Sequence, residues 1–165
     1  MGFGSMRLTV RSDTTTAVRV LRRAVELGVD HIDTAAFYFS PGGILDGEPG
    51  PVRYAPELIR EALYPYPQKL LIGTKVGPGR RPDGGWGGAT TPAELRFQVE
   101  ENLRRLGVDA LDLVNLRVSG DAAAIADRFG ALAEMRSEGL IRHLGLSNIR
   151  LAHLDEVAGI APNAA

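Results

Sequence analysis

The sequence of 165 residues predicts an α/β fold, an incomplete (β/α)8 TIM-type barrel of about five parallel strands alternating with helices. Three charged residues support this prediction, because Asp33, Lys75 and Arg117 each end an apolar run and lie 42 residues apart. A helical pattern fills each interval, and strands that alternate with helices favour parallel pairing. We therefore expect one domain over residues 1–165, with the strand ends meeting at a single rim.

The first half of the chain supplies three of the strands. GFGSMRL (2–8) is expected as the first strand, and a helix over 14–27 follows it with its apolar residues on one face. The second strand is VDHID (29–33). A short helix over 55–64 carries a proline at its start and precedes KLLIGTK (69–75), which is apolar enough for a fully buried strand.

The second half begins with the best-signalled helix, over 91–106, because Thr91 and Glu94 form a capping box there. The remaining elements are a strand over 110–116, a helix over 121–138, a strand over 141–147 and a helix that begins over 150–158. A closed barrel needs eight strands. The pattern therefore leaves two interpretations open: an open five-stranded α/β layer, or the front part of a barrel.

Composition excludes several classes of function. A net charge of −1 gives no electrostatic attraction to nucleic acid or to an anionic membrane. No apolar run approaches the roughly 20 residues that span a bilayer. The chain has no cysteine, which excludes disulfides and thiolate metal sites and fits a reducing cytoplasm. We expect a cytoplasmic protein that binds no nucleic acid, no membrane and no metal.

Four ordered motifs resemble the aldo-keto reductases. They are GVDHIDTAAFY, LLIGTKVG, TPAELRFQVEENLRRLGVDALDLVNLRV and GLIRHLGLSN, and together they cover essentially the whole chain. This resemblance implies an NAD(P)H-dependent (β/α)8 barrel that reduces aldehydes and ketones, here its N-terminal part, truncated after the fifth strand. The segment DLVNLRV is most similar to a bacterial branch with pyridoxal reductase-like members.

The resemblance assigns the catalytic residues. Tyr38 matches the tyrosine that protonates the carbonyl oxygen, Lys75 the cation that stabilises its phenolate, and Asp33 the carboxylate that pairs with the lysine. A phenol is a reluctant acid at neutral pH, so a nearby cation assists it. We expect these three residues to converge at the C-terminal rim. From the residues alone, an ordinary salt bridge beside a packed aromatic ring is the alternative.

The fourth catalytic position departs from the family pattern. Such reductases place a histidine five residues after the aspartate of the fourth strand, but counting from Asp112 gives Arg117. An arginine can donate hydrogen bonds to a carbonyl oxygen. Asn115 is a second polar candidate on the same strand face, and Trp86 lies in the expected substrate loop. Pocket shape and rim solvation are the alternative roles for Arg117 and Asn115.

The resemblance implies NADP(H) as cofactor, with NAD(H) as the alternative. The matching cofactor-binding residues are Gly4, Ser5, Met6, Asp33, Ser147 and Asn148. The sequence thus indicates an oxidoreductase that acts on a small carbonyl substrate. The competing interpretation is a non-catalytic truncated barrel, a pseudoenzyme or oligomerisation module. Open sheet edges would favour self-association in either case.

Overall fold

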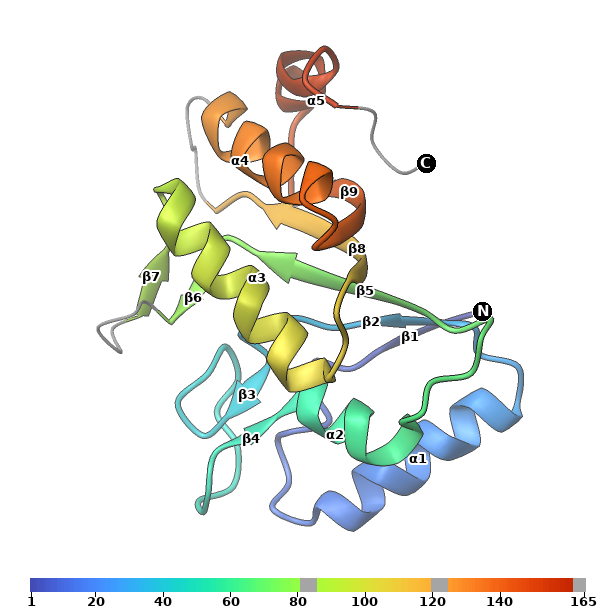
Figure 1. The fold of residues 1–165 in the computed structure, drawn as a ribbon. Coiled ribbons are helices and arrows are strands. Elements are labelled where there is room, and N and C mark those ends of the chain that lie inside the picture. Colours follow the sequence, from blue (N-terminus) through green and yellow to red (C-terminus); the bar gives the residue numbers. More distant parts are fainter. Residues whose placement is uncertain (81–85, 120–124, 162–165) are drawn as a thin grey trace.

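A five-stranded parallel sheet runs through the molecule (Figure 1). The computed structural model describes residues 1–80, 86–119 and 125–161. The strands stand in the order β1-β2-β5-β8-β9, and every pair of neighbours is parallel. Their bounds are β1 (Gly2–Gly4), β2 (His31–Asp33), β5 (Leu71–Val76), β8 (Leu111–Arg117) and β9 (Ile141–Ser147). The five predicted parallel strands are confirmed.

Helices alternate with these strands and cover one face of the sheet (Figure 1). They are α1 (Thr14–Glu26), α2 (Ala55–Leu63), α3 (Pro92–Leu106), α4 (Ala126–Ser137) and α5 (Leu151–Val157). The main apolar core lies between the helices and the sheet. On β8, Val114 and Leu116 are fully buried in this core, whereas Asn115 and Arg117 are only partly buried on the opposite face. None of the helices within the described residues is both long and apolar enough to cross a bilayer.

The predicted capping box fixes the start of α3. The Thr91 hydroxyl accepts a hydrogen bond from the Glu94 amide at 3.3 Å, and the Glu94 carboxylate accepts one from the Thr91 amide at 3.1 Å. These reciprocal bonds satisfy backbone donors that have no partner within the helix. The predicted start of α3 is therefore confirmed.

A buried polar contact ties α3 to the middle of β5. Thr74 Oγ1 donates to Asn102 Oδ1 at 2.5 Å, and Asn102 Nδ2 donates to the Gln98 carbonyl oxygen at 2.8 Å. Thr74 and Asn102 are fully buried. Because buried polar groups need partners, this contact fixes where the helix sits along the strand.

Two short antiparallel hairpins were not predicted. One pairs β3 (Phe39–Ser40) with β4 (Arg53–Tyr54), and the other pairs β6 (Pro78–Arg80) with β7 (Trp86–Gly88). Strands of two or three residues are too short to show an alternating pattern. Several predicted bounds also differ. The largest differences are that β1 ends at Gly4 and not at residue 8, and that α4 begins at Ala126 and not at residue 121; residues 120–124 lie outside the described part.

A buried arginine joins the two loops beside the first strand. The Arg53 guanidinium donates to the carbonyl oxygens of Thr9 at 3.0 Å, Pro51 at 2.9 Å and Glu48 at 2.9 Å. The loop after β1 and the loop between β3 and β4 are thus held by one side chain. This arrangement fixes the base of the hairpin that follows β2.

Candidate active site

The register of the sheet brings the predicted catalytic residues to one edge. Asp33 ends β2 opposite Gly73 of β5, and Lys75 lies opposite Asn115 of β8. Side chains alternate along a strand, so Lys75 and Asn115 point to the face opposite the helices. The carboxyl ends of parallel strands meet at the same edge. Asp33 and Lys75 therefore come from neighbouring strands to one rim.

Lys75 and Asp33 form a close ion pair. Lys75 Nζ lies 2.5 Å from Asp33 Oδ1 and also donates to the Thr34 carbonyl oxygen at 3.1 Å. The lysine side chain is 8% exposed and the aspartate side chain 44% exposed. A buried ammonium requires such partners because desolvation disfavours its charge. Asp33 thus holds the lysine while one of its faces remains open to solvent.

Tyr38 packs directly against this ion pair. It lies in the loop after β2, is 5% exposed, and donates its amide hydrogen to the Ala35 carbonyl at 3.0 Å. Lys75 Nζ lies 4.8 Å from the centroid of the Tyr38 ring, a cation–π contact. The described contacts of Lys75 include no hydrogen bond to the Tyr38 hydroxyl. The structure therefore brings Asp33, Lys75 and Tyr38 together, with the ammonium over the ring face.

Arg117 and Ser147 lie at the same end of the sheet. They are register partners at the ends of β8 and β9, two residues beyond the pair formed by Asn115 and Gly145. Asn115 Nδ2 lies 3.5 Å from the Thr74 carbonyl oxygen, and Asn115 Oδ1 occupies the space that a side chain at Gly145 would need. Asn115 therefore bridges β5 and β9, and Arg117 lies nearer to the rim.

The predicted cofactor residues fall on both sides of Lys75. Gly4 pairs with Asp33, and the Ser5 amide donates to the Asp33 carbonyl at 2.9 Å. Met6 packs against the aromatic cluster that contains Tyr38. On the far side, Asn148 follows β9 in a left-handed conformation with φ of 58°, and its side-chain Nδ2 donates to the Val118 carbonyl oxygen at 2.7 Å.

These residues fit the nicotinamide end of a dinucleotide. A Cβ placed at Gly4 would meet nothing within 4 Å, so a flat ring has room to approach beside Asp33. The Ser5 hydroxyl is buried and has no hydrogen-bond partner among the described residues. Hydroxyl and amide groups suit a carboxamide and ribose hydroxyls, which are neutral hydrogen-bonding groups.

Two further predictions concern Trp86 and metal binding. Trp86 begins β7, but its side chain lies outside the described part of the structure, so its contact with a substrate stays a prediction. Within residues 1–80, 86–119 and 125–161, His, Asp and Glu side chains form no group of three or more that could hold a metal ion.

Two contributors to the site were not among the predicted residues. The Thr34 carbonyl holds Lys75, and a backbone acceptor gives no signal in the side-chain pattern. Gln98 holds Gly77 beyond the end of β5. Gln98 did carry a signal, because it is a polar residue next to Val99 on the apolar side of a capped helix, and such residues are usually bonded when buried.

Comparison with known proteins identifies the family. The model of the aldo/keto reductase family matches residues 1–165. The chain belongs to the aldo/keto reductase family. It is 42% identical to pyridoxine 4-dehydrogenase of Escherichia coli, in an alignment that covers 98% of this chain and 56% of that protein.

Solved structures of family members share the fold. An aldo-keto reductase from Bacillus halodurans matches with a TM-score of 0.77 and 29% identity, over 99% of this chain and 50% of that one. An aldo-keto reductase from Klebsiella pneumoniae, solved in complex with NADPH, matches with a TM-score of 0.73 and 25% identity, over 97% of this chain and 49% of that one. The chain spans about half the length of these relatives. Its five-stranded sheet corresponds to that share of a (β/α)8 barrel.

Proposed function

We propose that the chain carries the catalytic residues of a reductase that converts an aldehyde or ketone to an alcohol. The observation that carries this proposal is the cluster of Lys75, Asp33 and Tyr38 at the carboxyl ends of neighbouring strands. An ammonium fixed by a carboxylate against a buried tyrosine is suited to proton transfer. Membership of the aldo/keto reductase family supports the same chemistry.

In this proposal Tyr38 supplies the proton. Its hydroxyl donates to the carbonyl oxygen of the substrate, and the phenolate that forms is stabilised by Lys75, whose ammonium is already held by Asp33 and the Thr34 carbonyl. Bound NADPH would supply the hydride to the carbonyl carbon. Because Lys75 is almost fully buried, its charge acts on the phenol with little screening by water.

The cofactor in this proposal is NADP(H), with NAD(H) as the alternative. Its nicotinamide end would lie along the rim between β1 and β9. The residues proposed to hold it are Gly4, Ser5, Met6, Asp33, Ser147 and Asn148. The open space in front of Gly4 and the unpartnered Ser5 hydroxyl support this placement.

The substrate would approach from the open side of the sheet. Arg117 at the end of β8 is proposed to orient the carbonyl, with Asn115 deeper in the site and Trp86 as a wall. The relative named pyridoxine 4-dehydrogenase makes pyridoxal a substrate worth testing first. A cytoplasmic location, where NADPH is supplied, is part of the same proposal.

Turnover and binding together test this proposal. Pyridoxal and a panel of small aldehydes are offered with NADPH, and the loss of reduced-cofactor absorbance is followed. In an assembly competent for reduction, we expect Tyr38→Phe to lower the rate by about 10²–10⁴-fold with NADPH binding unchanged. Full activity in Tyr38→Phe would show that another group donates the proton. A folded chain that binds NADPH without any turnover would favour the non-catalytic alternative, which the replacement of histidine by Arg117 supports.

A further inference from the structure

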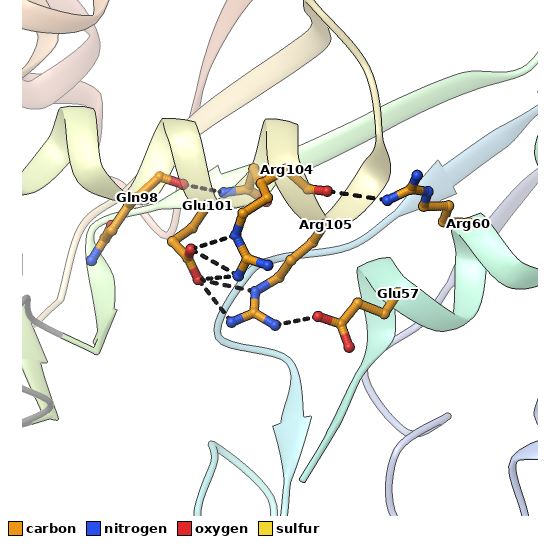
Figure 2. A network of polar contacts seen from close by, with 7 residues as sticks. Glu57, Arg60, Gln98, Glu101, Arg104 and Arg105 are labelled. Atoms are coloured by element: carbon orange, nitrogen blue, oxygen red, sulfur yellow. Dashed lines mark hydrogen bonds and ion pairs between the residues drawn. The ribbon is translucent and has the colours of Figure 1, made fainter.

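A nearly buried arginine near the end of α3 lies between two carboxylates. Arg105 is only 10% exposed at its side chain, with Nη2 2.7 Å from Glu101 and Nη1 2.5 Å from Glu57 of α2. Figure 2 shows the guanidinium held between these two acidic side chains. Partial burial acts to raise the pKa of Glu101, but hydrogen bonds and charge from Arg104 and Arg105 outweigh it and leave that pKa below its usual value.

The flat face of the same guanidinium covers an aromatic ring. Arg105 Cζ lies 3.3 Å from the centroid of the Tyr54 ring, which is a direct stacking distance. A guanidinium is planar and weakly hydrated, so it can stack on a ring while its edge binds carboxylates. Tyr54 is therefore held from the α3 side by Arg105, whose guanidinium is itself held by Glu57 and Glu101.

Tyr54 also contacts the segment that carries Tyr38. Tyr54 and Phe39 are register partners in the hairpin of β3 and β4, with ring centroids 5.0 Å apart. The Ala55 amide, next to Tyr54, donates to the Tyr38 carbonyl at 2.8 Å. Phe39 directly follows Tyr38, so both the side chain and the backbone of this hairpin hold the tyrosine in place.

We infer that Arg105 is a positioning residue for Tyr38, acting through Tyr54 and Phe39. Its stacking holds the hairpin so that the Tyr38 ring stays against Lys75, at the 4.8 Å separation found for the ammonium and the ring centroid. The inference rests on the proposed function only in treating Tyr38 as the proton donor. The positioning itself can be measured without turnover.

The neighbouring Arg104 provides a matched control. It also binds Glu101, at 2.9 Å, but its side chain is 62% exposed and no aromatic contact is described for it. Removing Arg104 therefore removes an ion pair of the same helix turn without touching the hairpin. If Arg105 only holds α2 against α3, removing Arg105 and removing Arg104 should differ in their effect on the stability of the protein and should not differ in their effect on Tyr38.

The test follows Tyr38 directly in the full chain. Fluorotyrosine is incorporated at the four tyrosines, and each ¹⁹F NMR signal is assigned by single Tyr→Phe substitution. We expect the Tyr38 signal to shift or broaden in Arg105→Met and to stay in place in Arg104→Met. The Tyr66 signal reports any general disturbance at the end of α3, because the Tyr66 hydroxyl donates to the Leu106 carbonyl next to Arg105. It should move less than the Tyr38 signal.

A second variant, Tyr54→Leu, tests the inference even if Arg105→Met fails to fold. This substitution removes the ring that lies between Arg105 and Phe39, so it should also move the Tyr38 signal. It removes no charged group, so no ion pair loses its partner. An unmoved Tyr38 signal in folded Tyr54→Leu would overturn the inference, and so would a Tyr66 signal that moves as much as that of Tyr38.

The kinetic arm separates this inference from the proposed function. Where the parent turns over, Tyr54→Leu and Arg105→Met should lower kcat by about 10²-fold, because small displacements of a reacting group are costly, and should leave the KM for NADPH unchanged. A raised KM with unchanged kcat would contradict positioning. Full activity in Tyr38→Phe would overturn the proposed function and leave the NMR result standing.

Discussion

Gln98 binds both backbone polar groups of Gly77. Its side-chain Oε1 accepts a hydrogen bond from the Gly77 backbone amide at 2.7 Å, and its side-chain Nε2 donates to the Gly77 carbonyl oxygen at 3.3 Å. Gly77 follows β5 two residues after Lys75, so α3 fixes the exit of the strand that carries the lysine. Gly77 has φ of 125°, and a side chain there would collide with the Arg117 carbonyl oxygen.

Gly77→Ala should destabilise the fold. The left-handed backbone and the collision together predict a loss of roughly 1–3 kcal/mol in the free energy of unfolding, measured by urea denaturation. Gly130→Ala is the control, because a Cβ there meets nothing within 4 Å and the position lies inside α4. It should stabilise by about 0.5–1 kcal/mol. Equal stability of the two variants would contradict the role given to Gly77.

Arg117 should affect the chemical step more than cofactor binding. If it orients the substrate carbonyl, Arg117→Ala lowers kcat and leaves the Kd for NADPH nearly unchanged. Arg117→His restores the residue usual at this position and should preserve or raise turnover. Steady-state kinetics and a fluorescence titration of NADPH measure the two effects. Unchanged turnover in Arg117→Ala would make Asn115 the better candidate.

The start of α3 should be sensitive to acid through Glu94. Hydrogen bonds from the Thr90 amide first, then from the Thr91 amide, lower the pKa of Glu94 to about 2 from its usual 4.5. A carboxylate with a lowered pKa in the folded state stabilises above its unfolded value. This contribution is therefore complete above about pH 4.5 and is lost as the pH falls toward about 2.

Glu94→Gln measures that contribution. Its Tm should fall less than that of the parent between neutral pH and pH values near 3, because glutamine cannot be protonated there. The control is Glu61→Gln, an exposed residue within α2 and away from any helix start. Parallel Tm curves for the parent and Glu94→Gln would contradict the assignment.

The 165-residue chain should self-associate. Within the described sheet, β1 and β9 each have a neighbour on one side only, and such edges present unpaired N–H and C=O groups. Sedimentation velocity over a range of concentrations should show oligomers, and titration with NADPH should show weak binding. A monomer at every concentration that binds NADPH at low micromolar Kd would refute this expectation.

Most of the central sheet could be predicted because its longer strands appear in the sequence as apolar runs separated by helical patterns. Runs such as LLIGTK and LDLVNL are mainly apolar, and Thr91 and Glu94 mark a helix start by the capping box that they form. The hairpins of β3 with β4 and β6 with β7 could not be predicted, because their strands are too short for periodicity. The position of the β3–β4 hairpin, for example, depends on the hydrogen bonds from Arg53 to three carbonyl oxygens.

The candidate site was predictable as a set of residues and less so as a geometry. The apolar runs that precede Asp33 and Lys75 predicted both residues at strand ends, and the register brings Lys75 Nζ to 2.5 Å from Asp33 Oδ1. The position of the Lys75 ammonium over the Tyr38 ring was not predicted, because it depends on how the loop after β2 folds back. Arg105 gave no signal either, since its partners Glu57 and Tyr54 are about 50 positions away in the chain.

The three carbonyls bound by Arg53 have a consequence for how this family member can diverge. Because one guanidinium joins the loop after β1 to residues 48 and 51, a change of length in either loop would strand its donors without acceptors. An insertion that displaces either set of acceptors should therefore destabilise both loops unless the other loop changes with it. New substrate preferences should accordingly arise by replacing individual side chains here, and by changes of loop length elsewhere on the rim.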